Sequence, residues 1–556
     1  MVGPIALVAV ACGPRRIERD AEYDYVLRHG LIVDGTGGAP YAGDVAIKGD
    51  RIAAVGAVSG HGREEIDVHG QAIAPGFVNM LSWATESLIA DGRGLSDLMQ
   101  GVTVEIFGEG QSMGPLNDRM KAQMRKFQVD IHYDITWTTL REFLDMLQKK
   151  GVALNVGSFV GAATVREHVV GEGMHVATAD ELARMRALVR QAMADGAFGV
   201  GAALIYVPGT FASTDELVEL ASEAAAAGGM YIAHIRNEGT RLLAAVDETI
   251  EISRRAKIRA EIYHFKAGGK PAWPLLPDAI ARIEKARGDG LAVSANMYTY
   301  PAAATGLDAA MPPWVRDGGQ DAWFARLKDP AIRARVAKEM NEPSDAWDNM
   351  WVGTGPEGIL LISFKNPALK KYTGKRLTEV AKEWGKSPEE TAMELVVQDQ
   401  TRVGAIYFSQ SEDNVRKVVA LPWVSFGSDE GAEAPEGVFL LSKPHPRAYG
   451  NFARLFARYV REEKRVTLQE AVRRAAAQPA ANLKLDHRGT LQAGNFADVV
   501  VFDPKTIQDH ATFEESQQLA TGMTHVFVNG VPEIRQGVYT GAKAGRALYG
   551  PGFRVW

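Results

Sequence analysis

Short apolar runs alternate with helical patterns along the central part of the chain. Stretches such as 179–196 and 213–229 space their apolar residues as helices do, open with a capping acid or hydroxyl and close on glycine. Strands that alternate with helices in this way are typical of a parallel sheet. We expect eight strands, at 76–80, 102–107, 153–159, 197–201, 230–233, 260–263, 291–296 and 423–427. Eight such units close a (β/α)8 TIM barrel.

The two ends of the chain have a different pattern. Residues 23–56, 489–504 and 524–537 alternate apolar and polar positions with turn residues between, which indicates strand meanders. We therefore predict an α/β protein in which a barrel at 76–485 carries a small β-sandwich formed by both termini, from 23–75 and 486–556. The gap between the seventh and eighth strands is too long for one helix. It predicts an insertion at about 300–420, a lid-like subdomain over the active face that is rich in tryptophan (Trp314, Trp323, Trp347, Trp351).

Composition narrows the function classes. The 556 residues carry a net charge of −6 with both signs interspersed, so the chain lacks the basic footprint that nucleic acid demands. A single cysteine, Cys12, excludes an internal disulfide or a cysteine-based metal cluster. Beyond the N-terminus, no stretch approaches the 18 or so apolar residues of a membrane span. The expected partner is a small-molecule substrate, and the sequence does not fix the oligomeric state.

Residues 1–22 resemble a secretory leader. The apolar run 5–12 ends in Ala9-Val10-Ala11-Cys12, which resembles a weak bacterial lipobox whose thiol is acylated after cleavage. No lysine or arginine precedes the run, and Ala9 stands where leucine is usual. We expect a periplasmic or outer-surface lipoprotein anchored through Cys12. The alternative is a cytoplasmic protein with a mis-assigned start or a disordered N-terminus.

Three polar residues follow predicted strands at the end where barrel active sites lie. His234 follows the fifth strand, His264 the sixth and Asp429 the eighth. Two imidazoles from adjacent strands and a carboxylate can converge on one ion, since imidazole is a preferred zinc donor and a catalytic zinc keeps three protein ligands. Either histidine alone could instead be a structural core residue.

Taken in order, the motifs along the chain carry a family resemblance. They are VDGTG (33–37), APGF (74–77), QGVT (100–103), HIRNEG (234–239), YHFKA (263–267), GSD (427–429), HPRAYG (445–450) and AGNFADVVVFDP (493–504). With these the chain resembles an N-acyl-D-amino-acid deacylase of the amidohydrolase superfamily over about residues 23–545. The resemblance implies a metal-bearing barrel with a β-sandwich from both termini, and hydrolysis of an N-acylated D-amino acid by metal-activated water.

The chain departs from that family at its metal ligands. Leu81 and Trp83 stand where the family's His-x-His pair lies, Gly110 stands where its ligand cysteine lies, and no lysine ends the fourth strand. We therefore expect one zinc ion per chain rather than two. Glu109 is the predicted third ligand beside His234 and His264, because two histidines alone rarely hold a catalytic ion. It could instead be a loop carboxylate paired with a basic residue, and Glu105 is a weaker candidate.

The resemblance also implies roles for other residues. Asp429 is the expected general base and acid, although Ser428-Asp429-Glu430 would also serve as a helix cap. A substrate carboxylate needs a cation or a fork of donors. Candidates for contacting the substrate are Lys266, Arg447, Tyr206, Tyr298 and Arg236, the last of which could instead pair with Glu238 or another acid and orient its loop.

Two other functions stay open. One is hydrolysis of another C–N bond, in a dipeptide, a cyclic imide or an N-carbamoyl compound. The other is a catalytically inactive, exported binding protein. Metal content would separate the two enzyme functions from the binding protein.

Overall fold

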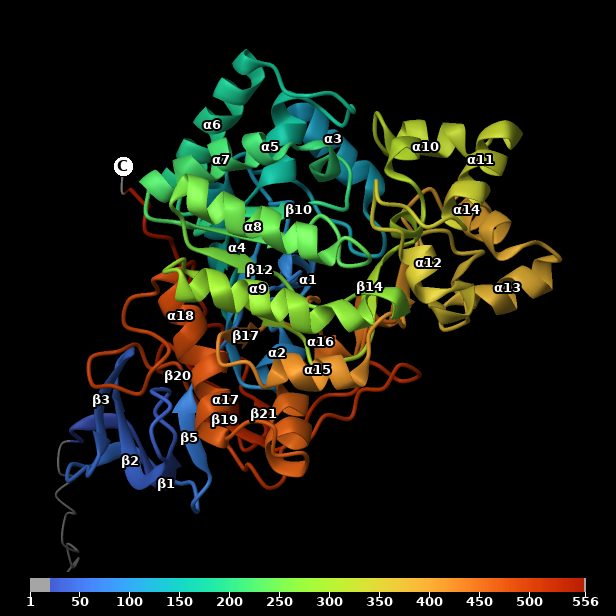
Figure 1. Cartoon of the computed structure of the whole chain (residues 1–556). Helices are drawn as coiled ribbons and strands as arrows, with labels where there is room; N and C mark the ends of the chain where they lie inside the picture. Colours follow the sequence, from blue (N-terminus) through green and yellow to red (C-terminus); the bar gives the residue numbers. More distant parts are fainter. Residues whose placement is uncertain (1–20, 555–556) are drawn as a thin grey trace, which may run out of the picture.

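Eight parallel strands close into a barrel at the centre of the computed structural model, which describes residues 21–554 (Figure 1). They form two sheets, β6-β7-β8 and β9-β10-β11-β12-β13-β17, in which β8 and β9 are consecutive parts of one strand. The barrel closes where the backbone N–H of Met80 donates to the carbonyl of Phe426 (3.2 Å). The barrel strands are β6 (Phe77–Asn79), β7 (Val102–Phe107), β8 (Asn155–Ser158), β9 (Val160–Gly161), β10 (Gly199–Ala203), β11 (Met230–His234), β12 (Ala260–Ile262), β13 (Val293–Met297) and β17 (Val424–Phe426). The predicted barrel is confirmed.

Helices cover the outside of the barrel, and every residue of its strands is buried, as parallel strands covered on both faces require. Local capping fixes where helices begin. Thr178 and Glu181 form a reciprocal capping box at α6, and the Ser213 hydroxyl accepts the backbone N–H of Glu216 at α7. The helices are α1 (Thr85–Ala90), α2 (Leu95–Leu98), α3 (Asp118–Phe127), α4 (Leu140–Lys150), α5 (Ala162–Val169), α6 (Ala179–Ala194), α7 (Thr214–Ala226), α8 (Leu242–Ala256), α9 (Leu276–Gly288), α15 (Glu412–Val419), α16 (Arg447–Arg454), α17 (Leu468–Val472) and α18 (Gln478–Leu483).

Shorter helical segments lie between these elements. They are the 3₁₀ turns η1 (Gly209–Phe211), η2 (Lys270–Leu275) and η7 (Gly437–Leu441), and the π-helical segments η8 (Leu455–Glu462) and η9 (Arg473–Ala477).

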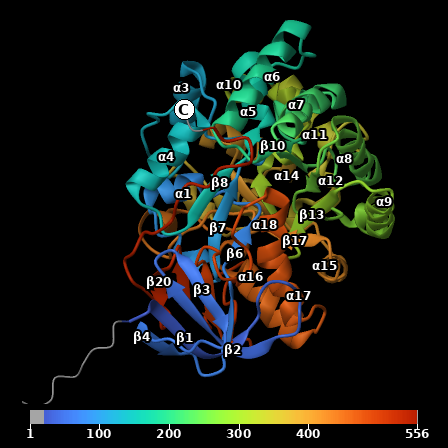
Figure 2. The same cartoon turned by 90° about the vertical axis from the view of Figure 1, so that its left-hand side faces the viewer.

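Both ends of the chain build one β structure beside the barrel, as predicted. β5 joins the two parts, because it pairs parallel with β1 and antiparallel with β18. Apolar side chains from both ends share one core, which includes Val45, Ile47 and Phe527. Figure 2 shows the blue N-terminal strands next to the red β20. The strands are β1 (Tyr23–Ile32), β2 (Tyr41–Lys48), β3 (Arg51–Gly56), β4 (Gly62–Asp67), β5 (Ala72–Pro75), β18 (Val499–Phe502), β19 (Met523–Val528), β20 (Val531–Arg535) and β21 (Val538–Tyr539).

The insertion lies between β13 and β17 and has its own core (Figure 1, yellow). Trp323 and Trp351 are buried in that core, whereas Trp314 and Trp347 are half-buried. Two of the four predicted tryptophans therefore stabilise the insertion itself. Its elements are β14 (Ala303–Gly306), η3 (Leu307–Ala310), η4 (Pro313–Arg316), α10 (Gln320–Arg326), α11 (Pro330–Met340), α12 (Met350–Thr354), η5 (Pro356–Gly358), β15 (Ile359–Ser363), η6 (Lys370–Tyr372), α13 (Leu377–Trp384), α14 (Pro388–Asp399) and β16 (Gly404–Tyr407).

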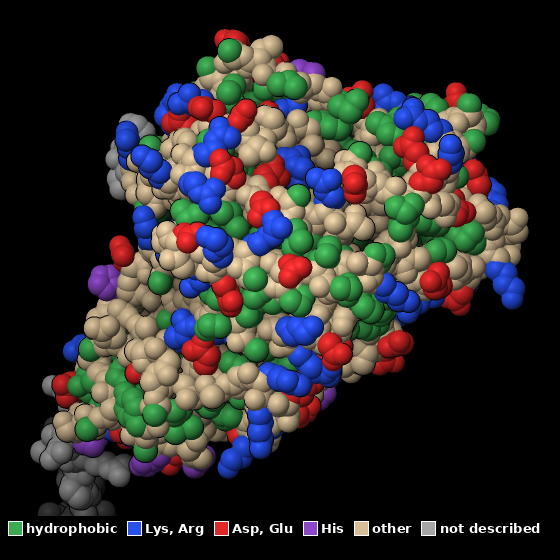
Figure 3. All heavy atoms as spheres, in the orientation of Figure 1, with side chains coloured by type: hydrophobic (Ala, Val, Ile, Leu, Met, Phe, Trp, Pro, Cys, Tyr) green, Lys and Arg blue, Asp and Glu red, His purple; other side chains and the backbone are tan. Residues whose placement is uncertain are grey.

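The distribution of charged side chains on the surface agrees with what the composition indicates. On the face shown in Figure 3, basic and acidic side chains are interspersed rather than gathered by sign. Within residues 21–554, no helix combines the length and apolar character that crossing a membrane needs. Cys12, the predicted lipid-attachment residue, lies outside the described residues.

Candidate metal and catalytic site

Three predicted ligands converge at the carboxyl end of the barrel. His234 ends β11, His264 follows β12 by two residues, and Glu109 follows β7 by two residues. Glu109 Oε1 lies 3.2 Å from His234 Nδ1 and 2.9 Å from His264 Nε2. One ligand atom from each residue falls within 4.8 Å of the others, and all three side chains are buried. The arrangement offers two imidazole nitrogens and one carboxylate oxygen, which is a donor set of catalytic zinc sites.

Glu238 lies behind both histidines and contacts His264. Its Oε1 lies 3.1 Å from His264 Nδ1, and its Oε2 lies 3.9 Å from His234 Nε2. A carboxylate against the far nitrogen of an imidazole fixes the ring so that the near nitrogen faces an ion, and this applies to His264. The far nitrogen of His234 has no hydrogen-bond partner among the described residues. The insertion braces this loop, since Asp348 accepts the backbone N–H of Glu238 (2.7 Å). The sequence suggests Glu238 only as a possible partner of Arg236, whereas the structure places it beside His264. The available signal for that place was its position four residues after His234.

The charges at this point favour a cation. Burial and Lys266 lower the pKa of His264, but Glu238 and Glu109 outweigh them and raise it to about 9. Burial opposes ionisation of Glu109, yet the two histidines hold its pKa well below the usual range. Two carboxylates therefore stabilise positive charge where the imidazoles meet, so the residues present fit a divalent metal ion.

Two site residues have an uncommon backbone conformation. His264 has a φ of +35° and Asp429 a φ of +55°, the left-handed region that residues other than glycine seldom adopt. Hydrogen bonds hold both, because Asn296 Oδ1 accepts the N–H of His264 and the Leu81 carbonyl accepts that of Asp429, each at 2.8 Å. Such strain gathers at functional sites, where the surrounding structure maintains it.

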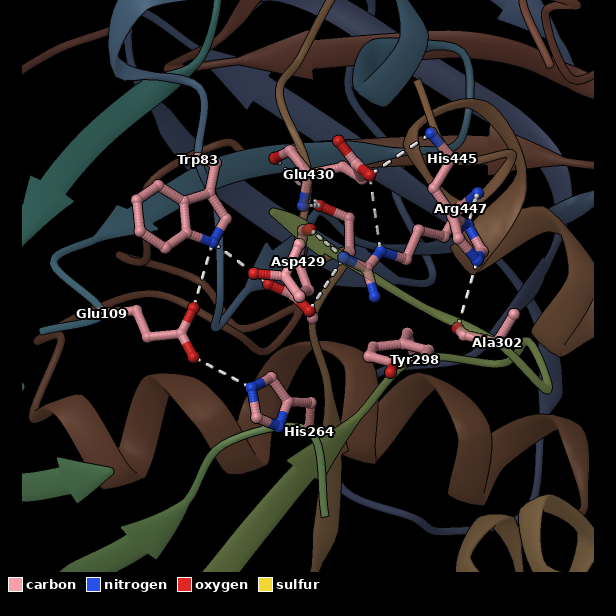
Figure 4. Close-up of polar contacts among 12 residues, drawn as sticks. Trp83, Glu109, His264, Tyr298, Ala302, Asp429, Glu430, His445 and Arg447 are labelled. Atoms are coloured by element: carbon pink, nitrogen blue, oxygen red, sulfur yellow. Dashed lines mark hydrogen bonds and ion pairs between the residues drawn. The ribbon is translucent and has the colours of Figure 1, made fainter. Parts of the chain in front are cut away.

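Asp429 follows β17 and faces the metal ligands (Figure 4). Its Oδ1 accepts the indole N–H of Trp83 (3.1 Å), and its Oδ2 pairs with Arg447 Nη2 (2.9 Å). Burial raises the pKa of Asp429 above that of an ordinary aspartate, although Arg447 opposes the shift. A carboxylate whose pKa moves towards neutrality suits a general base.

A cavity of about 460 Å³ opens over these groups. Predicted substrate contacts Lys266, Arg447, Tyr206 and Tyr298 all line it, beside Asp429 and the three ligands. Arg447 is 1% exposed, and its Nη1 has no hydrogen-bond partner among the described residues. Lys266 Nζ donates to Glu238 Oε1 (2.6 Å), and Arg447 stacks over the Tyr298 ring (4.3 Å). The cavity thus brings two cations and a phenol to one side of the metal ligands.

Two other predicted candidates lie elsewhere. Arg236 does not line this cavity, because it pairs with Glu248 of α8 (2.9 Å) and donates to the carbonyls of the η1 loop. That placement matches the loop-orienting alternative rather than contact with substrate. Glu105 is buried inside the barrel and accepts from Asn79 (2.9 Å), outside the ligand cluster.

The structure also shows what surrounds the positions that depart from the family pattern. Leu81 is 1% exposed and belongs to the barrel core. Gly110 has a φ of +69°, and a Cβ there would come within 2.5 Å of the Ala203 Cβ. A cysteine is therefore excluded at Gly110 in this backbone, whereas Glu109 beside it reaches the histidines.

Comparisons with known proteins identify the family to which this chain is similar. The amidohydrolase family model matches residues 150–533. A D-aminoacylase from Alcaligenes xylosoxydans xylosoxydans is 32% identical over 95% of this chain and 97% of its own length. The solved N-acyl-D-glutamate deacylase from Bordetella bronchiseptica, complexed with zinc and a phosphonate inhibitor, is 28% identical with a TM-score of 0.78, covering 95% of this chain and 99% of that one.

A second solved structure concerns metal use. It is a D-aminoacylase whose binuclear metal centre shows one-metal activation and second-metal attenuation, and it is 31% identical with a TM-score of 0.78 over 95% of this chain and all of that one. The family match covers more than half of this chain, and the D-aminoacylase relative is aligned over nearly its whole length. This chain belongs to the amidohydrolase family, within the group that contains D-aminoacylase.

Proposed function

We propose that this protein hydrolyses the amide bond of N-acyl-D-amino acids with one zinc ion per chain. The observation that carries the proposal is the convergence of three buried side chains, Glu109, His234 and His264, beside Asp429 at one cavity. The related D-aminoacylase and N-acyl-D-glutamate deacylase support the substrate class. The geometry supplies a donor set for metal and a separate carboxylate for proton transfer, which amide hydrolysis needs together.

Glu109, His234 and His264 would hold the ion. When bound, a zinc ion lowers the pKa of water and polarises the scissile carbonyl. The expectation of a single ion rests on Leu81 and Trp83, because a leucine side chain offers no donor atom and an indole nitrogen only donates a hydrogen bond. Glu238 contacts the far nitrogen of His264 (3.1 Å) and keeps that imidazole oriented towards Glu109.

Asp429 moves the proton. Its carboxylate takes a proton from the attacking water and delivers it to the leaving nitrogen, so one residue acts first as base and then as acid. Arg447 holds Asp429 Oδ2 at 2.9 Å and leaves Oδ1 on the side of the metal ligands. The raised pKa of Asp429 favours both directions of transfer, because its two protonation states lie closer in free energy near neutral pH.

The α-carboxylate of the substrate would contact the cationic side of the cavity. Arg447 Nη1 is buried and unpartnered within residues 21–554, so it offers donors that protein groups do not satisfy. Lys266 adds a second charge, and the Tyr298 hydroxyl lies in the same wall. We expect the carboxamide analogue of a good substrate, which lacks that negative charge, to lose at least about tenfold in kcat/KM, or 1.4 kcal/mol. Equal rates for the acid and its carboxamide would show that these residues do not bind a carboxylate.

A hydrolysis screen with added zinc tests the proposal against its alternatives. N-acetylated D- and L-amino acids, dipeptides, hydantoins and N-carbamoyl amino acids are compared at equal concentration. The proposed function predicts turnover of the N-acetyl-D-amino acids above all others. Preferential turnover of another class would assign a different C–N bond. No bound zinc, together with no turnover of any compound, would favour the binding-protein alternative.

A further inference from the structure

Trp83 connects the metal ligand to the catalytic carboxylate. Its indole Nε1 donates to Glu109 Oε2 (3.0 Å) and to Asp429 Oδ1 (3.1 Å), so one N–H is shared by two carboxylates (Figure 4). The three residues follow three different barrel strands, β6, β7 and β17. The backbone N–H of Trp83 also donates to the Glu430 carbonyl (2.9 Å), which ties the loop after β6 to the loop after β17.

The shared N–H divides the two oxygens of Glu109 between two tasks. Oε2 is engaged by Trp83, and Oε1 is left facing His234 and His264. Asp429 is divided in the same way, because Trp83 holds its Oδ1 and Arg447 holds its Oδ2. Two carboxylates that approach the same N–H repel each other unless a donor or a cation lies between them. In this protein the donor between them is the neutral indole.

Packing alone does not explain why a tryptophan stands at position 83. The Trp83 side chain is 42% exposed, so its ring contributes less buried apolar area than a core tryptophan. The exposed ring forms part of the wall between the metal-site cavity and an adjoining cavity of about 560 Å³. The polar edge of the ring, in contrast, points at the two carboxylates.

We propose that Trp83 is a positioning residue that takes the place of a second cation between Glu109 and Asp429. Its N–H fixes the ligand and the base relative to each other, and because an indole nitrogen has no free lone pair, it fills that place without binding metal. This inference rests on the proposed one-metal function. It identifies Trp83 as the group that allows the site to work with one metal ion.

Two substitutions at Trp83 test this. Trp83→Phe keeps the ring and removes the N–H, so Glu109 and Asp429 lose their common donor. We expect the zinc dissociation constant to rise at least about tenfold and kcat to fall by a similar factor, with KM within about twofold, since the substrate contacts are unchanged. Trp83→His places a ring nitrogen with a lone pair at a similar distance from the backbone. We expect that variant to bind two zinc ions per chain at excess zinc, where the parent binds one.

Trp314→Phe is the matched control. It also removes an indole N–H from a carboxylate, Glu339 (2.6 Å), but within the insertion. It should change neither zinc affinity nor kcat. Zinc affinity is measured by competition with a chelator, and stoichiometry by elemental analysis of dialysed protein, so both readouts are independent of substrate.

The outcomes separate the two proposals. Parent protein that binds no zinc contradicts the proposed function. Parent protein that binds zinc, together with a Trp83→Phe variant of unchanged zinc affinity and kcat, overturns the role of Trp83. A Trp83→His variant that stays at one zinc per chain would show that no cation place exists between the two carboxylates.

Discussion

Replacing Glu109 with Gln is the most demanding test of the proposed ligand set. The substitution keeps size and polarity and removes the charge at a residue that is 4% exposed. Glu109 uses one oxygen towards the two histidines and the other as acceptor for Trp83. Glutamine has one oxygen and one NH₂ group, so it cannot satisfy both sides. If its oxygen faces the metal, its NH₂ meets the indole N–H, and two donors face each other.

Two losses therefore add up. Removing a charged ligand should weaken zinc binding at least about tenfold, or 1.4 kcal/mol. Disturbing the contact with Trp83 should bring the total towards about a hundredfold, since outer contacts to metal ligands are worth roughly 10–100-fold in affinity. A carboxylate is also harder than a thiolate, so the parent site should accept manganese and cobalt more readily than a cysteine-containing site would.

The assay is zinc affinity by chelator competition, followed by turnover at saturating zinc. Glu172→Gln is the control, because Glu172 lines the same cavity and accepts from Gln123 (2.7 Å) without touching the ligand cluster. It should bind zinc like the parent. If Glu109→Gln also matches the parent in zinc affinity and turnover, the third ligand is another residue, and the reasoning from the Glu109 contacts is refuted.

Three further predictions follow from the same site and from the N-terminus. His234→Ala and His264→Ala should each lose both bound metal and activity; full metal content in either variant would remove that residue from the ligand set. Since Asp429 acts deprotonated and burial raises its pKa, kcat/KM should fall as pH drops through a value above the usual range for aspartate of about 3.9; a pH–rate profile flat down to pH 4 would contradict this. If Cys12 is a lipid-attachment site, native protein should incorporate labelled fatty acid and Cys12→Ser should not; equal labelling of the two would exclude it.

The barrel could be predicted because its strands and helix starts are determined by residues close together in the sequence. Parallel strands buried on both faces appear as short apolar runs, and the capping groups of α6 and α7 are visible as Thr178 and Ser213. Strand ends then placed His234, His264 and Asp429 at one rim. The three-stranded sheet of the insertion was not predicted, because its order β14-β16-β15 depends on pairing between segments far apart in the sequence.

The contacts between loops could not be predicted from the sequence. In the sequence, Trp83 is notable only because it stands where a ligand histidine is expected. Its hydrogen bonds to Glu109 and Asp429 arise from the packing of three separate strand ends. The orientation of Arg236 could not be predicted either, because it depends on the ion pair with Glu248 on α8. The positive φ at Gly110 explains why no cysteine stands there, and this backbone angle cannot be read from the sequence.

Titration of metal-free protein with zinc, with hydrolysis of an N-acetyl-D-amino acid and its L enantiomer followed at each addition, tests the central claim most directly. Activity towards the D enantiomer should rise in proportion to bound zinc and reach its maximum at one zinc per chain, while the L enantiomer stays a poor substrate. Activity that is independent of zinc, or a chain that binds one zinc without hydrolysing the D enantiomer, would contradict it.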